Sequence, residues 1–265
     1  MNGSMGSEMP VYQTIKTKLE SDVGTIQIYR PEANNTINDK LILECIEVLS
    51  QWDKQAKIVI LEGLPDVFCF GADFSAISEA ADAKNSPTQN SEPLYQLWQN
   101  LSEGPYISIA KLKGQVNAGG VGFVAACDIV LSEKKVMLSL SELLFSMMPA
   151  CVMPFLIRKI GFQKAHYMTL MTQPISASKA LEMGLIDALE ENVDDLLRKH
   201  LLRLRRLNKK GITRYKNYMN LLNPIAKENK QNAINANLEV FSDIESLAKI
   251  ARYVKTGKLP WEEDE

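Results

Sequence analysis

Short apolar runs alternate with segments of helical spacing, and this feature restricts the fold of the chain more than any other. Residues 58–61 and 106–112 form two such runs, and Glu62 and Gly63 close the first one. Runs of this length and composition are typical of buried strands. Apolar residues recur at helical spacing at positions 41–49, before the first run, and a glycine-rich turn with a helix follows the second. The alternation predicts an α/β layer architecture.

The same patterns predict the neighbouring elements. Residues 11–19 and 23–29 alternate apolar and polar side chains around a short turn, which predicts a β-hairpin at the edge of the sheet. Asn38 or Asp39 is placed to cap the helix of residues 41–49, and Gly184 is placed to end a later helix. Further strands are expected at 129–131 and 136–140, and further helices at 123–127, 162–171, 176–183, 194–207 and 233–254.

Residues 75–93 interrupt the alternation. They are rich in Ser, Ala, Asn, Asp and Pro and contain few large apolar side chains, so they are expected to form a long loop. A long loop beside a catalytic turn is often a lid over the site. A solvated excursion without a role explains the composition equally well.

Composition and charge set the defaults for partners and location. The chain has 265 residues, which suits one domain, and its formal net charge of -2 gives no reason to expect a nucleic-acid or membrane partner. No apolar run approaches the ~20 residues of a membrane span, and residues 1–10 lack the pattern of a signal peptide. His166 and His200 are far apart, and no cysteine pair has the spacing of a metal site. We therefore expect no metal and a reduced, cytoplasmic protein. The cysteines are Cys45, Cys69, Cys127 and Cys151.

Two glycine-containing turns are the strongest candidates for chemistry. Residues 68–74 follow a buried strand and include Phe70 and Gly71, and residues 114–122 precede a helix and include Gly119 and Gly120. Small residues let the backbone approach a ligand, and one N–H group from each turn can form an oxyanion hole, assisted by the helix dipole. Each turn alone is a weak signal, because such turns are common packing devices. Neither matches the G-x-G-x-x-G pattern of dinucleotide sites.

Several motifs flank these turns in a specific order. They are R-P-E-A-N-N-T-I-N at 30–38, F-G-A-D at 70–73, G-G at 119–120, C-D-I at 127–129, S-E-L-L at 141–144 with Pro149, and A-L-E-M-G-L-I-D at 180–187. In this order they resemble the crotonase (enoyl-CoA hydratase/isomerase) superfamily. The resemblance extends over residues 11–255, which is nearly the whole chain.

The resemblance implies a fold, an assembly and a class of substrate. It implies a spiral of repeated β-β-α units at 11–190 and a helical region at 191–265 that assembles a homotrimer or a dimer of trimers. Residues 1–10, outside the resemblance, are expected to form a flexible segment. The substrate would be a thioester of coenzyme A or of the phosphopantetheine on an acyl carrier protein, with no other cofactor. The backbone N–H groups of Phe70 and Gly119 would bind the thioester oxygen.

One of two family glutamates is retained. Hydratases of this family place glutamates at the positions that match Gly122 and Glu142, and only Glu142 is present here. Two carboxylates can hold an attacking water, whereas one can still move a single proton. The pattern therefore favours dehydration of a 3-hydroxyacyl thioester, in which Glu142 removes the C2 proton and then assists departure of the 3-hydroxyl. A capping or pairing role for Glu142 is the alternative.

A closer resemblance narrows the reaction. Segments at 30–38, 67–74, 116–122, 139–145, 155–158 and 161–168 resemble the dehydratase of polyketide β-branching cassettes. This resemblance implies conversion of (S)-3-hydroxy-3-methylglutaryl-carrier protein to 3-methylglutaconyl-carrier protein. The sibling decarboxylase tends to have Tyr and Lys where this chain has Phe74 and Ser78. The alternatives are decarboxylation or isomerisation of a related thioester, or a non-catalytic crotonase that binds RNA or a partner.

Other residues have weaker claims on the substrate. Asp73 is expected to order the first turn by accepting backbone hydrogen bonds, or to contact the substrate hydroxyl. Asn117 could bind substrate, but stabilisation of its turn is the simpler role. The apolar segment 148–154 suits a methyl-branched acyl group, and Cys151 within it could line the pocket. Core packing explains that segment almost as well.

The segment from Arg198 to Lys216 contains nine Lys or Arg residues and no acidic residue. A solvated helix face is the usual explanation for such a segment. Because carrier proteins are acidic, the cations could instead steer one toward the site. Nucleic-acid binding is the third interpretation, and it is weaker because the only aromatic residues in or near the segment are Tyr215 and Tyr218.

Overall fold

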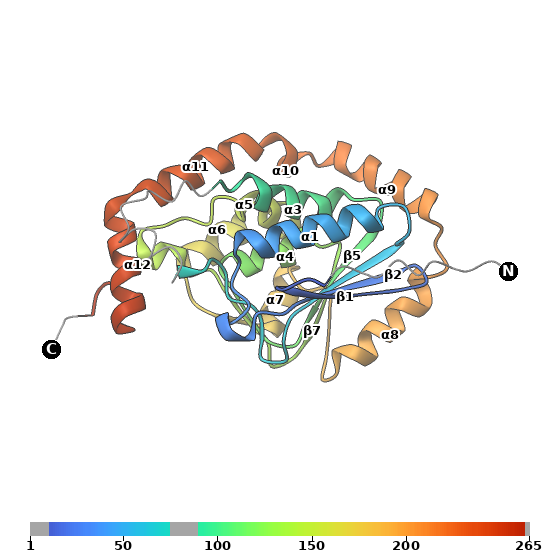
Figure 1. Ribbon diagram of the computed structural model, residues 1–265, viewed down its shortest axis with the longest axis horizontal. Helices are drawn as coiled ribbons and strands as arrows, with labels where there is room; N and C mark the ends of the chain where they lie inside the picture. Colours follow the sequence, from blue (N-terminus) through green and yellow to red (C-terminus); the bar gives the residue numbers. More distant parts are fainter. Residues whose placement is uncertain (1–10, 75–89, 263–265) are drawn as a thin grey trace.

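The computed structural model describes residues 11–74 and 90–262, and these residues form two β-sheets with helices packed around them (Figure 1). The larger sheet has the strand order β1-β2-β3-β5-β7-β10, and the smaller has the order β4-β6-β8-β9. The strands are β1 (Ile15–Glu20), β2 (Val23–Ile28), β3 (Ile58–Glu62), β4 (Val67–Cys69), β5 (Ile107–Leu112), β6 (Gln115–Asn117), β7 (Ile129–Glu133), β8 (Met137–Ser139), β9 (Ile175–Ser176) and β10 (Ala188–Glu190).

Helices surround both sheets. They are α1 (Asp39–Trp52), α3 (Glu92–Glu103), α4 (Gly119–Ala126), α5 (Met153–Ile160), α6 (Phe162–Met171), α7 (Ala177–Met183), α8 (Val193–Leu204), α9 (Lys209–Leu222), α10 (Ile225–Glu228), α11 (Lys230–Ser242) and α12 (Ile244–Thr256). Two short 3-10 helices are η1 (Pro31–Ala33) and η2 (Glu142–Phe145). Across the part of the chain that is described, no helix is both long enough and apolar enough to span a bilayer.

A repeated connection relates the two sheets. β3, β5 and β7 lie in the larger sheet, and each is followed directly by a strand of the smaller sheet, namely β4, β6 and β8. Within each sheet these strands are parallel. A helix then returns the chain to the larger sheet, as α3 does between β4 and β5 and α4 between β6 and β7. The predicted α/β architecture is confirmed, and its repeating unit is β-β-α.

The hairpin and the buried strands appear where the sequence predicts them. β1 pairs antiparallel with β2 and forms the edge of the larger sheet, while β2 and β3 pair in parallel. Four of the five residues of β3 are buried, as expected for a strand covered on both faces. Asn38 caps α1 by accepting a hydrogen bond from the Leu41 N–H at 2.9 Å. Gly184 ends α7 in the left-handed conformation.

Aromatic side chains form the centre of the core. Trp98 of α3 packs edge-to-face against Phe123 of α4 and Phe155 of α5, and Tyr95 also contacts Phe155. Every residue of α4 except its first is buried. A helix that is apolar on all sides needs cover on all sides, and α3, α5 and the small sheet surround α4 here.

The prediction of one long helix at 233–254 is wrong. The structure divides this region into α11 and α12 at Asp243, whose backbone is extended. The Asp243 side chain accepts hydrogen bonds from the backbone N–H groups of Glu245 and Ser246 and caps α12. The helical apolar period continues through this break, so the period alone did not reveal it. An aspartate that caps a new helix was the available signal.

Two further predictions need correction near the glycine turns. The helix expected at 123–127 begins four residues earlier, so Gly119 and Gly120 form its first turn. The loop expected at 75–93 is shorter at its end, because Glu92 and Pro93 belong to α3, where proline is accepted in the first turn. The remaining lid prediction, at 75–89, lies outside the described residues.

Lys216 does not belong to the exposed basic surface that the sequence suggested. Its side chain is 6% exposed, and its Nζ lies 2.6 Å from Asp128 Oδ2 and donates to the Tyr106 carbonyl at 2.8 Å. Burial lowers the pKa of Lys216, and the neighbouring Asp128 opposes this effect. Lys209 also points inward and donates to the carbonyls of Ala56 and Pro105. These contacts attach α9 to the core.

We expect Lys216→Met to destabilise the fold by up to about 3 kcal/mol, because it leaves the partly buried Asp128 carboxylate, 25% exposed, without its cation. Urea unfolding, followed by tryptophan fluorescence, measures this loss. Lys210→Met is the matched control, because Lys210 is exposed on the same helix. Equal unfolding free energies for the two variants would contradict the structural role of the pair.

Candidate active site

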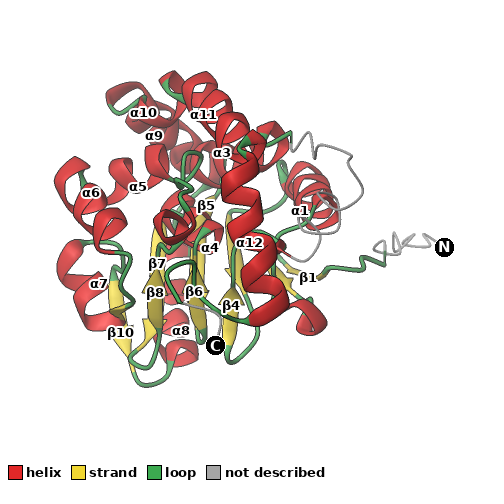
Figure 2. Ribbon diagram, turned by 90° about the vertical axis from the view of Figure 1, so that its left-hand side faces the viewer, coloured by secondary structure: helices red, strands yellow, loops and turns green. Residues whose placement is uncertain are grey.

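Three neighbouring strand ends bring the predicted site residues together. β4, β6 and β8 are parallel neighbours in the small sheet. Phe70 follows β4, Gly119 follows β6 after one residue, and Glu142 follows β8 after two. Because parallel strands end at the same edge, all three residues lie at one edge of the sheet. Figure 2 shows the three strands side by side, with α12 in front of β4. In open α/β sheets ligands bind at the carboxyl ends of strands.

The two glycine turns are in direct contact. Gly71 has a φ of +87°, and a Cβ atom added there would lie 2.7 Å from the Ala118 Cβ and 3.1 Å from the Gly119 nitrogen. A side chain at position 71 would therefore separate the turns. Gly120 lies over the Cys69 carbonyl, where an added Cβ would approach the oxygen to 2.4 Å. The two turns that the sequence predicted to act together are therefore adjacent.

The proposed oxyanion donors are available in this arrangement. Within the described residues, neither the Phe70 N–H nor the Gly119 N–H donates to a backbone carbonyl. Gly119 is the first residue of α4, where N–H groups have no partner inside the helix. Ala118, directly before it, has φ 49° and ψ -123°, which is a sparsely populated conformation for a residue with a side chain. Strain of this kind is concentrated at functional sites.

Asn117 connects the second turn to the segment that carries the glutamate. Its Oδ1 accepts hydrogen bonds from Ser139 Oγ at 2.7 Å and from Ser141 Oγ at 3.2 Å. The Ala118 N–H also donates to the Ser139 carbonyl at 2.9 Å. These bonds join the ends of β6 and β8, and they fit the turn-stabilising role that the sequence favoured. Contact of Asn117 with substrate stays a prediction.

Glu142 has the environment of a proton-transfer group. Its Oε2 is buried and has no hydrogen-bond partner among the described residues. Burial raises the pKa of Glu142 to about 7, although the backbone N–H groups of Glu142 and Ser141 oppose the shift. A buried carboxyl with an unsatisfied oxygen is costly unless a ligand uses it. A pKa near the working pH is also what general acid–base catalysis requires.

The C-terminal helices cover the segment that carries Glu142. Phe145 of η2 packs edge-to-face against Tyr253 of α12 and against Phe74, which follows the first turn. The Ser146 carbonyl and hydroxyl accept hydrogen bonds from Ser246 and Lys249 of α12. This separate apolar cluster lowers the local polarity on one side of η2. A lower local polarity strengthens every electrostatic interaction at the site.

A tryptophan occupies the space beside Gly122. A Cβ atom added at Gly122 would lie 2.4 Å from Trp98 Cζ2. The Trp98 side chain is 1% exposed and is packed between Phe123 and Phe155. A carboxylate therefore cannot project from position 122 unless the core rearranges. Sequence reasoning identified the missing second glutamate but did not identify Trp98, because it did not predict the helix that carries this residue.

The structure places Asp73 in a buried ion pair. Its Oδ2 lies 3.1 Å from Arg30 Nη2 and accepts from Thr36 Oγ1 at 3.2 Å. Order in the first turn was the expected role of Asp73, and the side chains of Arg30 and Thr36 contribute to it here. Acceptance of backbone hydrogen bonds, the route that the sequence suggested, stays a prediction. Contact of Asp73 with the substrate hydroxyl stays a prediction.

Cys151 lies in the main core and contacts the C-terminal region. It is 4% exposed, and its Sγ lies 3.7 Å from the Ala233 carbonyl of α11. Burial raises the pKa of Cys151 to about 11, so its thiol is not activated as a nucleophile. All four cysteines are free and buried. The predicted place of Cys151 in the pocket lining stays a prediction. Over the described residues, no group of three or more His, Cys, Asp or Glu side chains could bind a metal ion.

Comparison with known proteins agrees with this geometry. Residues 18–264 match the family model of enoyl-CoA hydratase/isomerase. The chain is 54% identical to the bacillaene synthase dehydratase PksH of Bacillus subtilis strain 168 over 257 residues, which cover 97% of this chain and 99% of that protein. It is 27% identical to a probable enoyl-CoA hydratase of Rhodobacter capsulatus, over 69% of this chain and 71% of that protein.

Comparison with solved structures shows the same similarity in the fold. The crystal structure of a Bacillus subtilis protein described as a putative polyketide biosynthesis enoyl-CoA hydratase superposes with a TM-score of 0.92 at 54% identity. The match covers 94% of this chain and 100% of that chain.

We expect Glu142→Gln to stabilise the fold in a pH-dependent manner. The folded pKa of about 7 lies above the ordinary 4.5, so between these values the folded chain binds a proton that the unfolded chain has lost. Ionisation of Glu142 therefore lowers stability as the pH rises toward 7, and this cost is absent below the ordinary pKa. The variant, which cannot ionise, should have a higher unfolding temperature than wild type at about pH 8.

Differential scanning fluorimetry at about pH 5 and pH 8 measures the difference, which should shrink at the lower pH. Glu182→Gln is the control, because the Glu182 side chain is 66% exposed. A difference between variant and wild type that is the same at both pH values would contradict the raised pKa.

Proposed function

The chain belongs to the enoyl-CoA hydratase/isomerase family, and we propose that it dehydrates (S)-3-hydroxy-3-methylglutaryl-carrier protein to 3-methylglutaconyl-carrier protein. The crotonase fold predicted from the sequence is confirmed by the family match and by the structural neighbours. The reaction class is that of a hydro-lyase, a dehydratase of polyketide synthesis, as the 54% identity to the bacillaene synthase dehydratase supports. The 3-hydroxy-3-methylglutaryl group is the finer part of the proposal.

The observation that carries the proposal is a single buried glutamate at the same sheet edge as two backbone N–H groups that, within the described residues, donate to no backbone carbonyl. Glu142 has a raised pKa and an unpartnered oxygen, and Trp98 excludes a second carboxylate at position 122. One carboxyl can accept a proton and return it. Holding an attacking water between two carboxylates, as two-glutamate hydratases do, requires a second carboxyl, which position 122 does not supply here. Elimination of water from a 3-hydroxyacyl thioester needs only one such group on one face of the substrate.

The steps balance with this one group. Ionised Glu142 takes the C2 proton, and the electron pair moves into the thioester enolate, whose oxygen accepts from the Phe70 and Gly119 N–H groups. The enolate then reforms the carbonyl, the C2–C3 double bond forms, and the C3–O bond breaks. The protonated Glu142 donates its proton to the departing hydroxyl, which leaves as water. Each oxyanion donor is worth roughly 3–4 kcal/mol to the transition state, and no cofactor beyond the substrate's pantetheine is required.

Acyl carrier protein is the proposed partner, and the exposed part of the basic segment is the proposed place of its attraction. Lys209 and Lys216 are excluded because they point into the core. The cations that remain exposed are Arg198, Lys199, Arg203, Arg205, Arg206, Lys210 and Arg214. Their helices, α8 and α9, lie at the opposite end of the long axis from α12 in Figure 1. Attraction at this segment would thus act at long range, or on the site of a neighbouring copy.

A homotrimer or a dimer of trimers is the proposed assembly. Two helices expose apolar side chains that a monomer has no reason to expose together. On α6 these are Phe162, Tyr167, Leu170 and Met171, and on α9 they are Tyr215, Tyr218, Met219, Leu221 and Leu222. Two different surfaces that meet between copies form a ring if the rotation closes.

Intact-mass analysis of loaded carrier protein tests the reaction. Wild type incubated with (S)-3-hydroxy-3-methylglutaryl-carrier protein should cause the loss of one water, and Glu142→Gln should slow this loss by at least ~100-fold, because its proton transfer is removed. Glu182→Gln should retain the wild-type rate. Loss of carbon dioxide would establish a decarboxylase instead, and an unchanged mass with folded wild type would contradict the dehydratase proposal.

Light scattering tests the assembly. The wild-type mass should be three or six times the 29.7 kDa of one chain, and the double variant Leu221→Lys and Leu222→Lys should reduce it, because buried lysines are costly at an interface core. Leu43→Lys, an exposed site on α1, should leave the mass unchanged. A monomeric wild type would contradict the assembly.

A further inference from the structure

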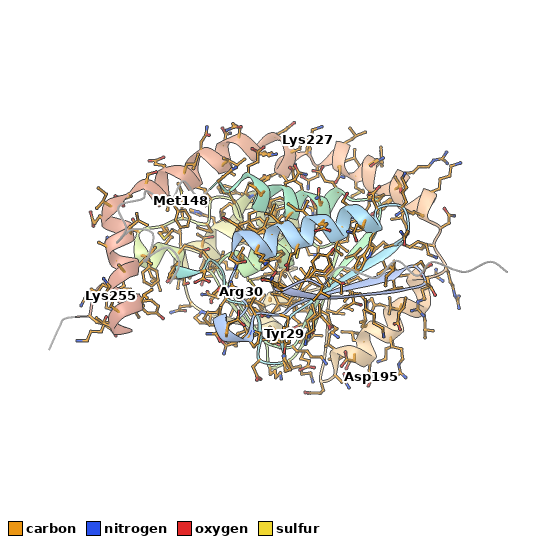
Figure 3. The ribbon with its side chains drawn as sticks, viewed as in Figure 1. Tyr29, Arg30, Met148, Asp195, Lys227 and Lys255 are labelled. Carbon is orange, nitrogen blue, oxygen red and sulfur yellow. The ribbon has the colours of Figure 1, made fainter. Side chains whose placement is uncertain are left out.

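The segment Arg30–Ile37, which we call the cradle, contacts the first oxyanion turn at several points. It contains η1 and connects β2 to α1. Its motif drew attention in the sequence only as a carrier of the family resemblance, and the proposed reaction gives its side chains no role. Figure 3 places Arg30 within the molecule beside Tyr29, away from the peripheral Lys227 and Lys255.

Asn35 is the central residue of the cradle. It is 0% exposed and has a φ of 52°. Its Oδ1 accepts from the Arg30 N–H at 2.8 Å. Its Nδ2 lies 3.1 Å from the Ile28 carbonyl, 3.2 Å from the Val67 carbonyl and 3.1 Å from the Phe68 carbonyl. One side chain therefore joins the end of β2 to two residues of β4.

This contact matters because β4 is a weakly supported strand. It has three residues and lies at the edge of the small sheet. Among the residues that the structure describes, it pairs only with β6, through an irregular register. A strand that short gains little from one neighbour. On its open side the Asn35 amide takes the place of a second strand by donating to its carbonyls. Phe70, whose N–H is the proposed donor, comes directly after β4.

The cradle also fixes the turn beyond Phe70. The Ile37 N–H donates to the Gly71 carbonyl at 2.7 Å, and Ile37 forms a parallel bridge with Ala72. Arg30 pairs with Asp73 and donates to the carbonyl and hydroxyl of Thr36. The backbone on both sides of Phe70 is thus attached to the same segment.

The cradle reaches the second turn as well. A Cβ atom added at Gly119 would lie 3.0 Å from the Ile37 Cδ1, so the Ile37 side chain packs against the residue that supplies the other N–H. Oxyanion donors act only when their geometry is set before the reaction, within about 0.5 Å. The contacts of the cradle restrict the relative position of the two donors.

We propose that Asn35 and Arg30 are positioning residues that set the Phe70 N–H for binding the enolate oxygen. Neither side chain touches the reacting atoms. They act through β4 and the first turn, so their loss should lower kcat with little change in KM. This inference rests on the oxyanion role that the proposed function gives to Phe70.

The test compares Asn35→Gly with Asn34→Gly. Both asparagines have positive φ values, 52° and 49°, which glycine adopts without strain, and Asn34 is exposed. Asn35→Gly should lower kcat for dehydration of the loaded carrier protein by about 10- to 100-fold, because small displacements of a catalytic group cost up to ~100-fold. KM should stay within a few-fold. Asn34→Gly should retain the wild-type kcat within about twofold.

An infrared readout separates positioning from stability. The probe is carrier protein loaded with 3-methylglutaryl-pantetheine, which lacks the 3-hydroxyl and cannot dehydrate, with ¹³C at the thioester carbonyl. Isotope-edited spectra should show a carbonyl band at lower frequency when bound to wild type or Asn34→Gly, because two N–H donors polarise the bond. The shift should be smaller with Asn35→Gly.

Each outcome decides the proposal. A folded Asn35→Gly with the kcat and carbonyl shift of wild type overturns it. If wild type dehydrates its substrate but shows no carbonyl shift, the inference and the oxyanion role of Phe70 both fail. If Asn35→Gly does not fold, Arg30→Lys takes its place, because one ammonium cannot reproduce the fork of guanidinium bonds to Thr36 and Asp73. A folded Arg30→Lys should show a reduced kcat and shift, and wild-type values would overturn the proposal.

Discussion

Parallel pairing of three short strands is the constraint on which the candidate site depends. β4, β6 and β8 contain only three residues each, yet their shared direction brings a residue of each following turn to one edge of the small sheet. Because side chains alternate with a period of two, a slip of one residue in any of these pairings would turn the strand's side chains to the opposite face of the sheet. The larger sheet supports the arrangement, since each short strand follows directly from a buried strand of that sheet.

The site then combines two demands that oppose each other. Catalysis needs a carboxyl with a pKa near neutrality, and burial of the Glu142 carboxyl supplies it. Burial also leaves Glu142 Oε2 without a partner in the described residues, which costs stability. The fold tolerates this cost because contacts elsewhere, such as the Asn117 bonds to Ser139 and Ser141, keep the backbone in place. Functional sites commonly trade stability for chemistry in this manner.

Local patterns explain which predictions succeeded and which failed. The hairpin, β3 and α1 follow from alternation, apolar composition and the Asn38 cap, all of which are local. α3 was missed because the loop predicted at 75–93 includes its first two residues and no helix was predicted behind that loop. Its core residue Trp98 was therefore missed too. The division of α11 from α12 at Asp243 escaped detection because the apolar period runs through it. Lys216 was assigned to the surface because charge alone does not reveal a buried partner.

The sequence by itself determined the α/β class, the positions of both glycine turns, and the retention of Glu142 without a glutamate at Gly122. These properties depend on residue type and spacing along the chain. Tertiary structure alone decided that Trp98 fills the space beside Gly122, that Asn35 supports the open side of β4, and that burial raises the pKa of Glu142. Each depends on residues distant in sequence, and desolvation and packing arise only when those residues are brought together.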